Sequence, residues 1–403
     1  MKRIFSCLLA LMLIFSFSSF AFAEEESSKE LKFRDGEFII LQLSDPQDDV
    51  YPAYDMINFV SLALDTVKPD LVVLTGDLVE DKRGADAGVD DEDTREGVCV
   101  YDDEGEIKHD ETLENAKIAA DNVLSIINNA KIPFVTAQGN NDHICGVTNK
   151  EWLEIYSKYE YCLTTDMSED EEDRIDCNVL IKGSDGKAAF NIWCMDTGKK
   201  EVTKEQINWY KEKSNLLKEE NGGKAVPSFA FQHIYVSEIG NLFKRCNLWD
   251  SCCIADGLGL YKLDRSKATG NFYEITKTPG KSSKEFKAWL KQGDVIGAYF
   301  GHEHYGNYTG KYKGIELGLT NGCEFAKSGP YGIRVLTLHE NDIENYDNEV
   351  FTYEGSVKTN DASFVPLVNE DYDPVYSTRE EMLAAVKENI INNLKAIIKE
   401  IFD

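Results

Sequence analysis

Short apolar runs that alternate with helical stretches constrain the fold of this chain most strongly. The runs are rich in β-branched and aromatic residues and are typical of buried strands. They lie at Phe38–Ser44, Leu71–Thr75, Pro133–Ala137, Ala188–Met195, Ser228–Phe231, Val295–Phe300, Ile315–Leu319 and Ile333–Leu338. Between them, Met56–Val67 carries apolar residues with a period near 3.6, as an amphipathic helix does. The alternation predicts an α/β fold.

Capping-box patterns mark the starts of three further helices. A Ser or Thr followed three residues later by Glu or Gln can satisfy two free backbone N–H groups at a helix start. The pairs are Thr203 with Gln206, Ser282 with Glu285, and Ser377 with Glu380. The last pair predicts a helix near Glu380–Ile401, at the end of a C-terminal extension over residues 346–403.

The N-terminus has the pattern of an export signal. Lys2 and Arg3 precede an apolar run from Ile4 to Phe22, and residues 21–23 read Ala-Phe-Ala, a small-x-small cleavage pattern. We therefore expect a signal peptide over residues 1–23, a short N-terminal segment over 24–37, and a secreted or envelope-associated protein with no membrane span after cleavage. An uncleaved anchor is the alternative, because the run approaches spanning length.

Charge disfavours two classes of partner. The chain has 72 acidic and 43 basic residues, and its net charge is −29. Such a surface repels nucleic acid and anionic lipid, so we expect neither nucleic-acid binding nor a polybasic membrane contact.

Two acidic segments and the cysteines add little to the functional prediction. Residues 84–110 and 166–176 are rich in Asp and Glu, and we interpret them as solvated insertions within one domain over 38–345. A calcium-binding or substrate-selecting loop is the alternative, but the spacing of an EF-hand loop is missing. Ten cysteines include one in the apolar leader, so the remaining odd number leaves at least one thiol that is unpaired or pairs between molecules.

Polar side chains follow five of the predicted strands, at the point where each strand ends. They are Asp45 and Gln47, Asp77, Asn140, His233, and the pair His302 and His304. In an α/β sheet, ligands bind beyond the carboxyl ends of the strands, so these side chains can converge on one crevice. Carboxylate, amide and imidazole donors together suit divalent transition metals. The sequence therefore predicts a metal site built from strand ends.

In these motifs the chain resembles the calcineurin-like metallophosphoesterases. Their pattern reads Asp-x-His, Gly-Asp, Gly-Asn-His-Asp/Glu, a single His, and Gly-His-x-His. The corresponding stretches here are Asp45–Gln47, Gly76–Asp77, Gly139–Asp142, His233 and Gly301–His304. The resemblance implies a four-layer αββα sandwich of two facing mixed sheets.

The resemblance also implies two metal centres that share one ligand. Asp45, Gln47, Asp77 and His304 would hold the first ion, and Asp77, Asn140, His233 and His302 the second. Candidate ions are Mn, Fe, Zn or Ca. The catalytic candidates are Asp77, Asn140, His143 and His302.

Two departures from the family pattern affect the chemistry. Gln47 stands where the family usually has His, and its neutral amide oxygen should weaken zinc binding and favour iron, manganese or calcium. Asn141 stands where a His normally protonates the leaving group, and an amide cannot do so. His143 is the candidate replacement, and a solvent-facing loop histidine is the alternative interpretation.

We therefore expect a secreted phosphoric ester hydrolase, either phosphatase or phosphodiesterase. Two divalent ions would activate a shared water, and the metal-bound hydroxide would attack the phosphorus of a monoester or diester. Gln47 and Asn141 also allow a catalytically weak or inactive binding protein of the cell envelope. A purely structural two-metal site is a further alternative.

Overall fold

The computed structural model describes residues 30–82, 96–168, 174–247, 250, 254–256, 259–272, 279–325, 330–356, 359, 361–367, 383, 384, 387 and 391. The expected signal peptide, the helix start at Ser377, and parts of both acidic segments lie outside these residues, as does most of the expected C-terminal helix. No helix within the described residues is long and apolar enough to cross a membrane.

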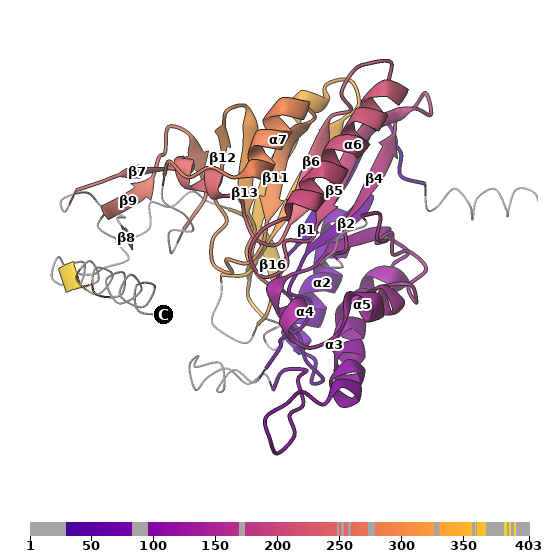
Figure 1. Cartoon of the computed structure of the whole chain (residues 1–403), viewed down its shortest axis with the longest axis vertical. Helices are drawn as coiled ribbons and strands as arrows, with labels where there is room; N and C mark the ends of the chain where they lie inside the picture. The colour runs from indigo at the N-terminus through magenta and orange to yellow at the C-terminus, as the bar shows by residue number, and fades with distance from the viewer. Residues whose placement is uncertain are drawn as a thin grey trace, which may run out of the picture.

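Two large mixed sheets form the body of the molecule (Figure 1). The first has the order β16-β15-β14-β1-β2-β3, with strands β1 (Glu37–Leu43), β2 (Leu71–Thr75), β3 (Phe134–Ala137), β14 (Gly332–His339), β15 (Asp347–Glu354) and β16 (Ser363–Pro366). The second has the order β10-β12-β13-β11-β6-β5-β4, with strands β4 (Cys177–Lys182), β5 (Ala188–Met195), β6 (Ser228–Gln232), β10 (Ala268–Thr269), β11 (Val295–Phe300), β12 (Thr309–Tyr312) and β13 (Ile315–Leu319).

Helices and a small third sheet complete the described elements. The helices are α2 (Tyr54–Val67), α3 (His109–Asn129), α4 (Asn140–Ile144), α5 (Asn149–Tyr156), α6 (Lys204–Glu220) and α7 (Lys284–Gln292), with 3-10 turns η1 (Ser237–Leu242) and η2 (Ile343–Asn345). Strands β7 (Phe243–Arg245), β9 (Gly259–Leu263) and β8 (Ile254–Asp256) form the small sheet, which extends to one side in Figure 1.

The centre of each large sheet is parallel. Strands β1, β2 and β3 run in one direction, and so do β5, β6, β11 and β13. Strands β14, β15 and β16 add antiparallel pairs to the first sheet, as β4, β10 and β12 do to the second. Because parallel strands end at the same edge, the residues that follow them lie near one another.

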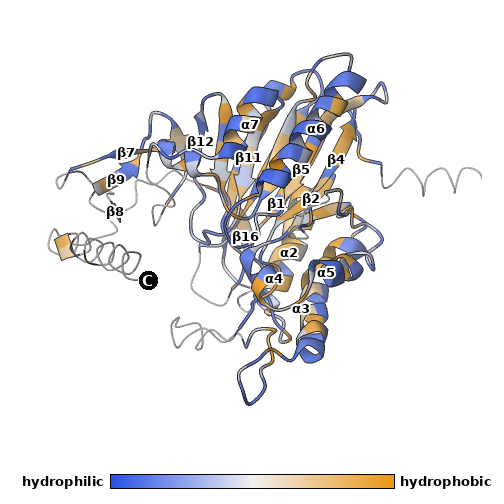
Figure 2. Ribbon diagram, viewed as in Figure 1, coloured by the Kyte–Doolittle hydropathy of each residue, from blue (hydrophilic) through white to orange (hydrophobic). Residues whose placement is uncertain are grey.

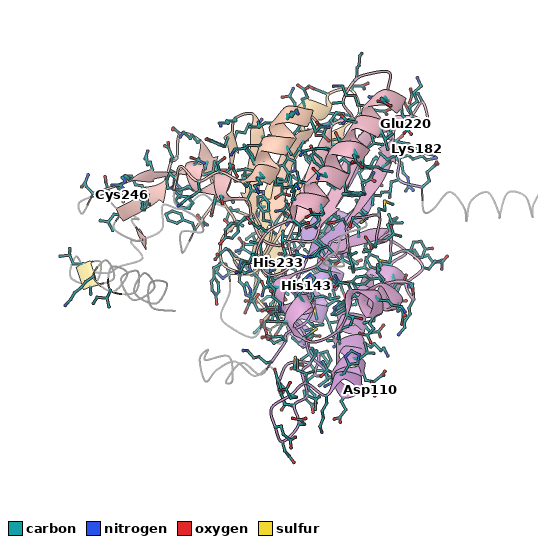
Figure 3. The ribbon with its side chains drawn as sticks, viewed as in Figure 1. Asp110, His143, Lys182, Glu220, His233 and Cys246 are labelled. Carbon is teal, nitrogen blue, oxygen red and sulfur yellow. The ribbon has the colours of Figure 1, made fainter. Side chains whose placement is uncertain are left out.

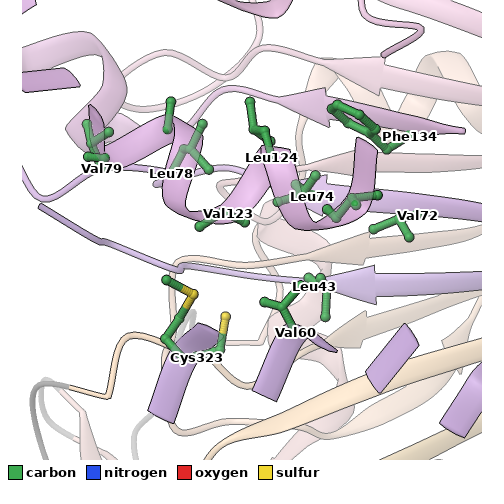
Figure 4. Close-up of a cluster of buried hydrophobic side chains, with 14 of the residues drawn as sticks. Leu43, Val60, Val72, Leu74, Leu78, Val79, Val123, Leu124, Phe134 and Cys323 are labelled. Atoms are coloured by element: carbon green, nitrogen blue, oxygen red, sulfur yellow. The ribbon is translucent and has the colours of Figure 1, made fainter. Parts of the chain in front are cut away.

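Alternating side chains divide the interior into three apolar layers. In β1, Ile40 packs between the two sheets, whereas its neighbour Leu41 packs toward α2 and α3. The layer under these helices includes Leu43, Val60 and Phe134 (Figure 4). Successive strand residues point to opposite faces, so both faces of each sheet are buried.

The third layer lies under α6 and α7. Trp193 of β5 and Trp289 of α7 are buried there, and Figure 2 shows the hydrophilic faces of both helices turned outward. The order helix, sheet, sheet, helix is the predicted αββα sandwich, which the structure confirms.

One of the two predicted helix caps that lie within the described residues is confirmed. Thr203 caps α6, and its side chain accepts a hydrogen bond from the Gln206 N–H. The prediction that Ser282 caps α7 is wrong, because Ser283 accepts from the Phe286 N–H instead. The backbone N–H and the hydroxyl of Ser283 both donate to the Glu238 carboxylate, at 2.7 and 2.8 Å, and this contact holds Ser283 as the cap.

The cysteines confirm that unpaired thiols are present. Cys246 is disulfide-bonded, and the described residues include six free cysteines: Cys99, Cys145, Cys162, Cys177, Cys194 and Cys323.

Candidate metal centre

Two groups of metal-binding side chains meet where the parallel strands of both sheets end. One ligand atom from each of Asp77, His233 and His302 lies within 4.8 Å of the others. The same holds for Asp45, Asp77 and His304. Asp77 belongs to both groups, and the structure thus brings together five of the predicted ligands around one shared carboxylate.

The backbone is strained at several of these positions. Asp45, Gln47, Asp77 and His302 all have positive φ angles, of 48°, 41°, 50° and 74°. Residues other than glycine seldom adopt this conformation, and such strain concentrates at functional sites. The turns aim the side chains back across the strand ends.

Gly76, just before Asp77, is required by close packing. Its φ is 88°, and a Cβ atom there would lie 2.6 Å from the backbone nitrogen of Gly139. The loops after β2 and β3 therefore touch through glycine backbone. Asp142 joins the same loops, because its carboxylate accepts from the N–H groups of Leu78 and Gly139, each at 2.9 Å.

Asp77 is held by contacts on both carboxylate oxygens. Oδ1 accepts from the Asn141 N–H at 2.8 Å, and Oδ2 accepts from the Gln47 amide at 3.1 Å. Nε2 of His233 lies 3.3 Å from Oδ2. Burial favours the neutral acid, but the charge of His233 and the hydrogen bonds from His233 and the Asn141 N–H together outweigh burial and lower the pKa of Asp77. Asp77 is therefore an anionic ligand candidate.

His233 presents one defined nitrogen to the centre. Its Nδ1 donates to the carbonyl oxygen of Thr75 at 2.8 Å, so a neutral ring would keep its proton on Nδ1 and offer the lone pair of Nε2 to a metal ion. Nε2 faces the Asn140 side-chain oxygen at 3.0 Å and Nδ1 of His302 at 3.2 Å. Several acceptor atoms therefore face one another.

His304, like His233, is oriented by an oxygen atom that contacts its Nδ1. Here the oxygen belongs to a carboxylate that the sequence did not predict. Nδ1 of His304 lies 3.0 Å from the buried Glu324, and Nε2 lies 3.5 Å from Oδ1 of Asp45. A carboxylate on the far ring nitrogen fixes the tautomer of a metal-binding imidazole and raises its basicity. The backbone N–H of His302 donates to Asp45 at 3.1 Å.

Asn140 and Asn141 form a pair. The amide of Asn140 donates to the side-chain oxygen of Asn141 at 2.8 Å, which leaves the Asn140 oxygen toward His233. Asn141, at the position of the family's proton donor, therefore orients one predicted ligand through its side chain and Asp77 through its backbone.

The electrostatics of this donor set fit divalent cations. Burial opposes a charged imidazole, yet Asp77 and Asp45 raise the pKa of His233 to about 9. Against the same effect of burial, Glu324 and Asp45 raise the pKa of His304 to about 10. The site thus stabilises positive charge between its converging side chains. Carboxylate, amide and imidazole groups are also ligands that transition metals bind.

His143 is directed by a second buried carboxylate. Its Nε2 lies 2.6 Å from Oδ1 of Asp196, which has no exposed surface and directly follows β5. Asp196 in turn accepts from the N–H groups of Gly198 and Ile175 at 2.7 and 3.1 Å. His143 stands three residues after Asn140 on the short helix α4, and Figure 3 shows His143 and His233 near the middle of the molecule.

Sequence reasoning missed Asp196 and Glu324 for different reasons. Asp196 comes immediately after a strand, and Asp45 and Asp77 come one residue later after theirs, so the same pattern could have found it. Glu324 lies five residues after β13 ends, and no spacing rule links it to His304.

The chain is similar in sequence to known phosphoesterases. The family model described as calcineurin-like phosphoesterase matches residues 38–306. Two Arabidopsis thaliana proteins, named probable inactive purple acid phosphatases 14 and 29, are each 23% identical to this chain over 348 and 347 residues. These matches cover 75% of this chain in both cases, and 75% and 76% of the two relatives.

The chain is also similar to solved structures at low sequence identity. A dimetal phosphatase from Danio rerio is 11% identical, with a TM-score of 0.43, and the match covers 83% of this chain and 99% of that one. A structure of PhoD is 10% identical, with a TM-score of 0.47, and the match covers 92% of this chain and 79% of the other.

Proposed function

This chain belongs to the calcineurin-like phosphoesterase family, and we propose that it is a dinuclear metal enzyme that hydrolyses a phosphate monoester or diester. One observation supports the proposal most strongly: two clusters of possible metal ligands, mostly buried, share the carboxylate of Asp77. A shared carboxylate between two donor sets is what a pair of neighbouring ions requires.

The ligands divide between two ions in this proposal. Asp45, Gln47, Asp77 and His304 hold one, and Asp77, Asn140, His233 and His302 hold the other. Two such ions, when bound, supply a nucleophile from water and neutralise charge on the phosphoryl group. The protein contributes the fixed ligand directions described above, through the Thr75 carbonyl behind His233 and Glu324 behind His304.

His143 is the proposed proton donor to the leaving alcohol. Asp196 accepts from Nε2, so Nδ1 is the ring nitrogen that can exchange a proton with the substrate. A buried aspartate stabilises the protonated imidazole and holds its tautomer, as in other His–Asp pairs. General acid help of this kind is worth about 10²–10⁴-fold in rate.

Turnover of chromogenic esters tests the proposal. The full-length mature chain, loaded in turn with manganese, iron, zinc or calcium, is assayed on p-nitrophenyl phosphate and bis-p-nitrophenyl phosphate. We expect turnover of at least one ester with at least one metal, and its loss in Asp77→Asn. Asp185→Asn, an exposed and distant change, is the matched control. The absence of turnover with every metal contradicts the proposal.

A catalytically inactive binding protein is the second candidate. Gln47 and Asn141 replace two histidines of the family pattern, and the two Arabidopsis relatives are named probable inactive phosphatases. This candidate predicts two bound ions and phosphate binding without hydrolysis. The ester assay together with metal analysis separates the two functions.

Export of the protein is a separate proposal that rests on the N-terminal pattern. We expect a mature chain that begins at Glu24 and lies outside the cytoplasm. N-terminal sequencing of protein from the native source, after cell fractionation, tests it. A mature protein that retains residues 1–23 contradicts it.

A further inference from the structure

A large cavity lies beside the candidate metal centre, at the carboxyl end of the second sheet. Its volume is about 810 Å³. The loop after β5, the residues after β6, and the first turns of α6 and α7 form its walls. Both helices begin at this edge of the sheet, because each runs back antiparallel to the strands that it covers (Figure 1).

The cavity is basic in a protein that is strongly acidic. Five cationic side chains contribute to its walls: Arg174, Lys199, Lys200, Lys204 and Lys284. Two acidic residues, Glu201 and Glu285, also line it. Since the whole chain has 72 acidic and 43 basic residues, this excess of positive charge is a local reversal that would concentrate anions.

The four lysines are available to a ligand. All of them are exposed, and none takes part in an ion pair within the described part of the chain. The helix cap Thr203 also lines the cavity, so the positive dipole end of α6 adds to the charge. Ser283, the cap of α7, lines the cavity too, but its backbone N–H already donates to the Glu238 carboxylate.

The buried floor of the cavity carries polar atoms without partners. Within the described residues, the Oε1 atoms of Gln232 and Glu285 have no hydrogen-bond partner although both side chains are buried. Burial raises the pKa of Glu285 to about 8, so this carboxyl is largely protonated at neutral pH and can donate to an anion. A buried polar atom at a cavity wall needs a partner, and bound water or a polar ligand in the cavity can supply it.

Two side chains connect the cavity to the metal centre. Tyr235 lines the cavity, and its ring centroid lies 6.0 Å from that of His302. His143, the proposed proton donor, lines it as well. A leaving group that takes a proton from His143 would therefore extend into the basic cavity.

We propose that this cavity binds a second phosphate on the leaving-group side of the substrate, so that bisphosphorylated compounds are the preferred substrate class. The proposal rests on the proposed phosphoesterase function, because it places the first phosphate at the metal centre. Lysine ammonium groups bind phosphate as mobile point charges, which suits a cavity that accepts different carbon skeletons.

Binding of non-hydrolysable ligands tests the cavity apart from catalysis. Alkane α,ω-bisphosphonates of increasing length and the matching monophosphonates are titrated into metal-loaded full-length protein by calorimetry. We expect one length of bisphosphonate to bind at least about tenfold more tightly than its monophosphonate, since a second anion meets several cations. In the double variant Lys200→Gln/Lys204→Gln, the ratio of the monophosphonate Kd to the bisphosphonate Kd should fall toward one.

A matched variant controls for net charge. The double variant Lys218→Gln/Lys224→Gln removes the same charge near the opposite end of α6, where Glu220 is labelled in Figure 3. Along the helix, Lys218 lies about 21 Å from Lys204. This control should keep the wild-type ratio. An equal loss in both double variants, or no preference for any bisphosphonate in the wild type, overturns the proposal.

Hydrolysis assays distinguish failure of the cavity from failure of the proposed function. Glucose 1,6-bisphosphate and glucose 1-phosphate are compared by kcat/KM. Turnover of both without preference, together with equal phosphonate affinities, overturns the cavity but leaves the phosphoesterase. Selective bisphosphonate binding that depends on Lys200 and Lys204, without turnover of any ester, supports the cavity and overturns the enzyme.

Discussion

The half-buried imidazole of His143 pairs with the buried carboxylate of Asp196, with 2.6 Å between Nε2 and Oδ1. The pair connects the short helix after β3 in one sheet to the end of β5 in the other. Asp196 is itself fixed by two backbone N–H groups, so the direction of His143 is set by the fold. This arrangement favours the proton-donor interpretation of His143 over a solvent-facing loop histidine.

His143→Ala should slow esters of poor leaving alcohols by about 10²-fold or more, and p-nitrophenyl esters much less, because nitrophenolate leaves without a proton. The measurement compares kcat/KM for alkyl and p-nitrophenyl phosphates. Asp196→Asn should show the same pattern in weaker form, and its melting temperature checks that the amide keeps the fold. Equal slowing of both esters in His143→Ala would remove it from the proton-donor role.

Gln47→His should raise the affinity for zinc relative to manganese. The amide of Gln47 lies 3.1 Å from Asp77, so an imidazole at this position can reach the same centre and supply a nitrogen donor that zinc prefers. Competitive metal titration measures the ranking. Gln292→His, near the end of α7, is the control. An unchanged ranking would count against Gln47 as a ligand.

Glu324→Gln should weaken one metal site and spare the other. Glu324 contacts Nδ1 of His304, and loss of such a carboxylate costs about 10–100-fold in metal affinity. His233 relies on the Thr75 carbonyl instead, so its site should keep its ion. Metal titration followed by elemental analysis should find that one of the two ions per chain binds with lower affinity. Equal weakening of both ions would show that Glu324 does not act through His304.

The buried Glu285 should make stability fall as the pH rises. Burial raises its pKa from 4.5 to about 8, so the native state binds more protons than the unfolded state between these values. Stability then decreases with pH across that window. Glu285→Gln should flatten the dependence of the melting temperature on pH between about 5 and 8, whereas the exposed Glu205→Gln should not. An unchanged slope in Glu285→Gln contradicts this prediction.

The strand ends explain how much of the site the sequence could predict. Asp45 and His233 follow buried apolar runs directly, and Asp77 follows one after a single glycine. The period and length of these runs define strands, and parallel strands bring their ends together. The predicted strands at 71–75, 188–195, 295–300 and 315–319 therefore match the structure at both ends.

What the sequence could not predict depends on contacts between distant segments. Ser282 is the better cap locally because Glu285 stands three residues later, and Glu238 on another element favours Ser283 instead. Glu324 reaches His304 from a loop without a pattern of its own. The basic cavity gathers cations from four segments, none of which is basic over any length.

Metal content measures the central claim most directly. Elemental analysis of natively purified wild type and of Asp77→Asn gives the number of divalent ions per chain. Because Asp77 is common to both clusters, the wild type should contain two ions and the variant close to none. A wild-type chain without divalent ions, or an Asp77→Asn chain that keeps both ions, would contradict the shared-ligand centre on which the proposed function rests.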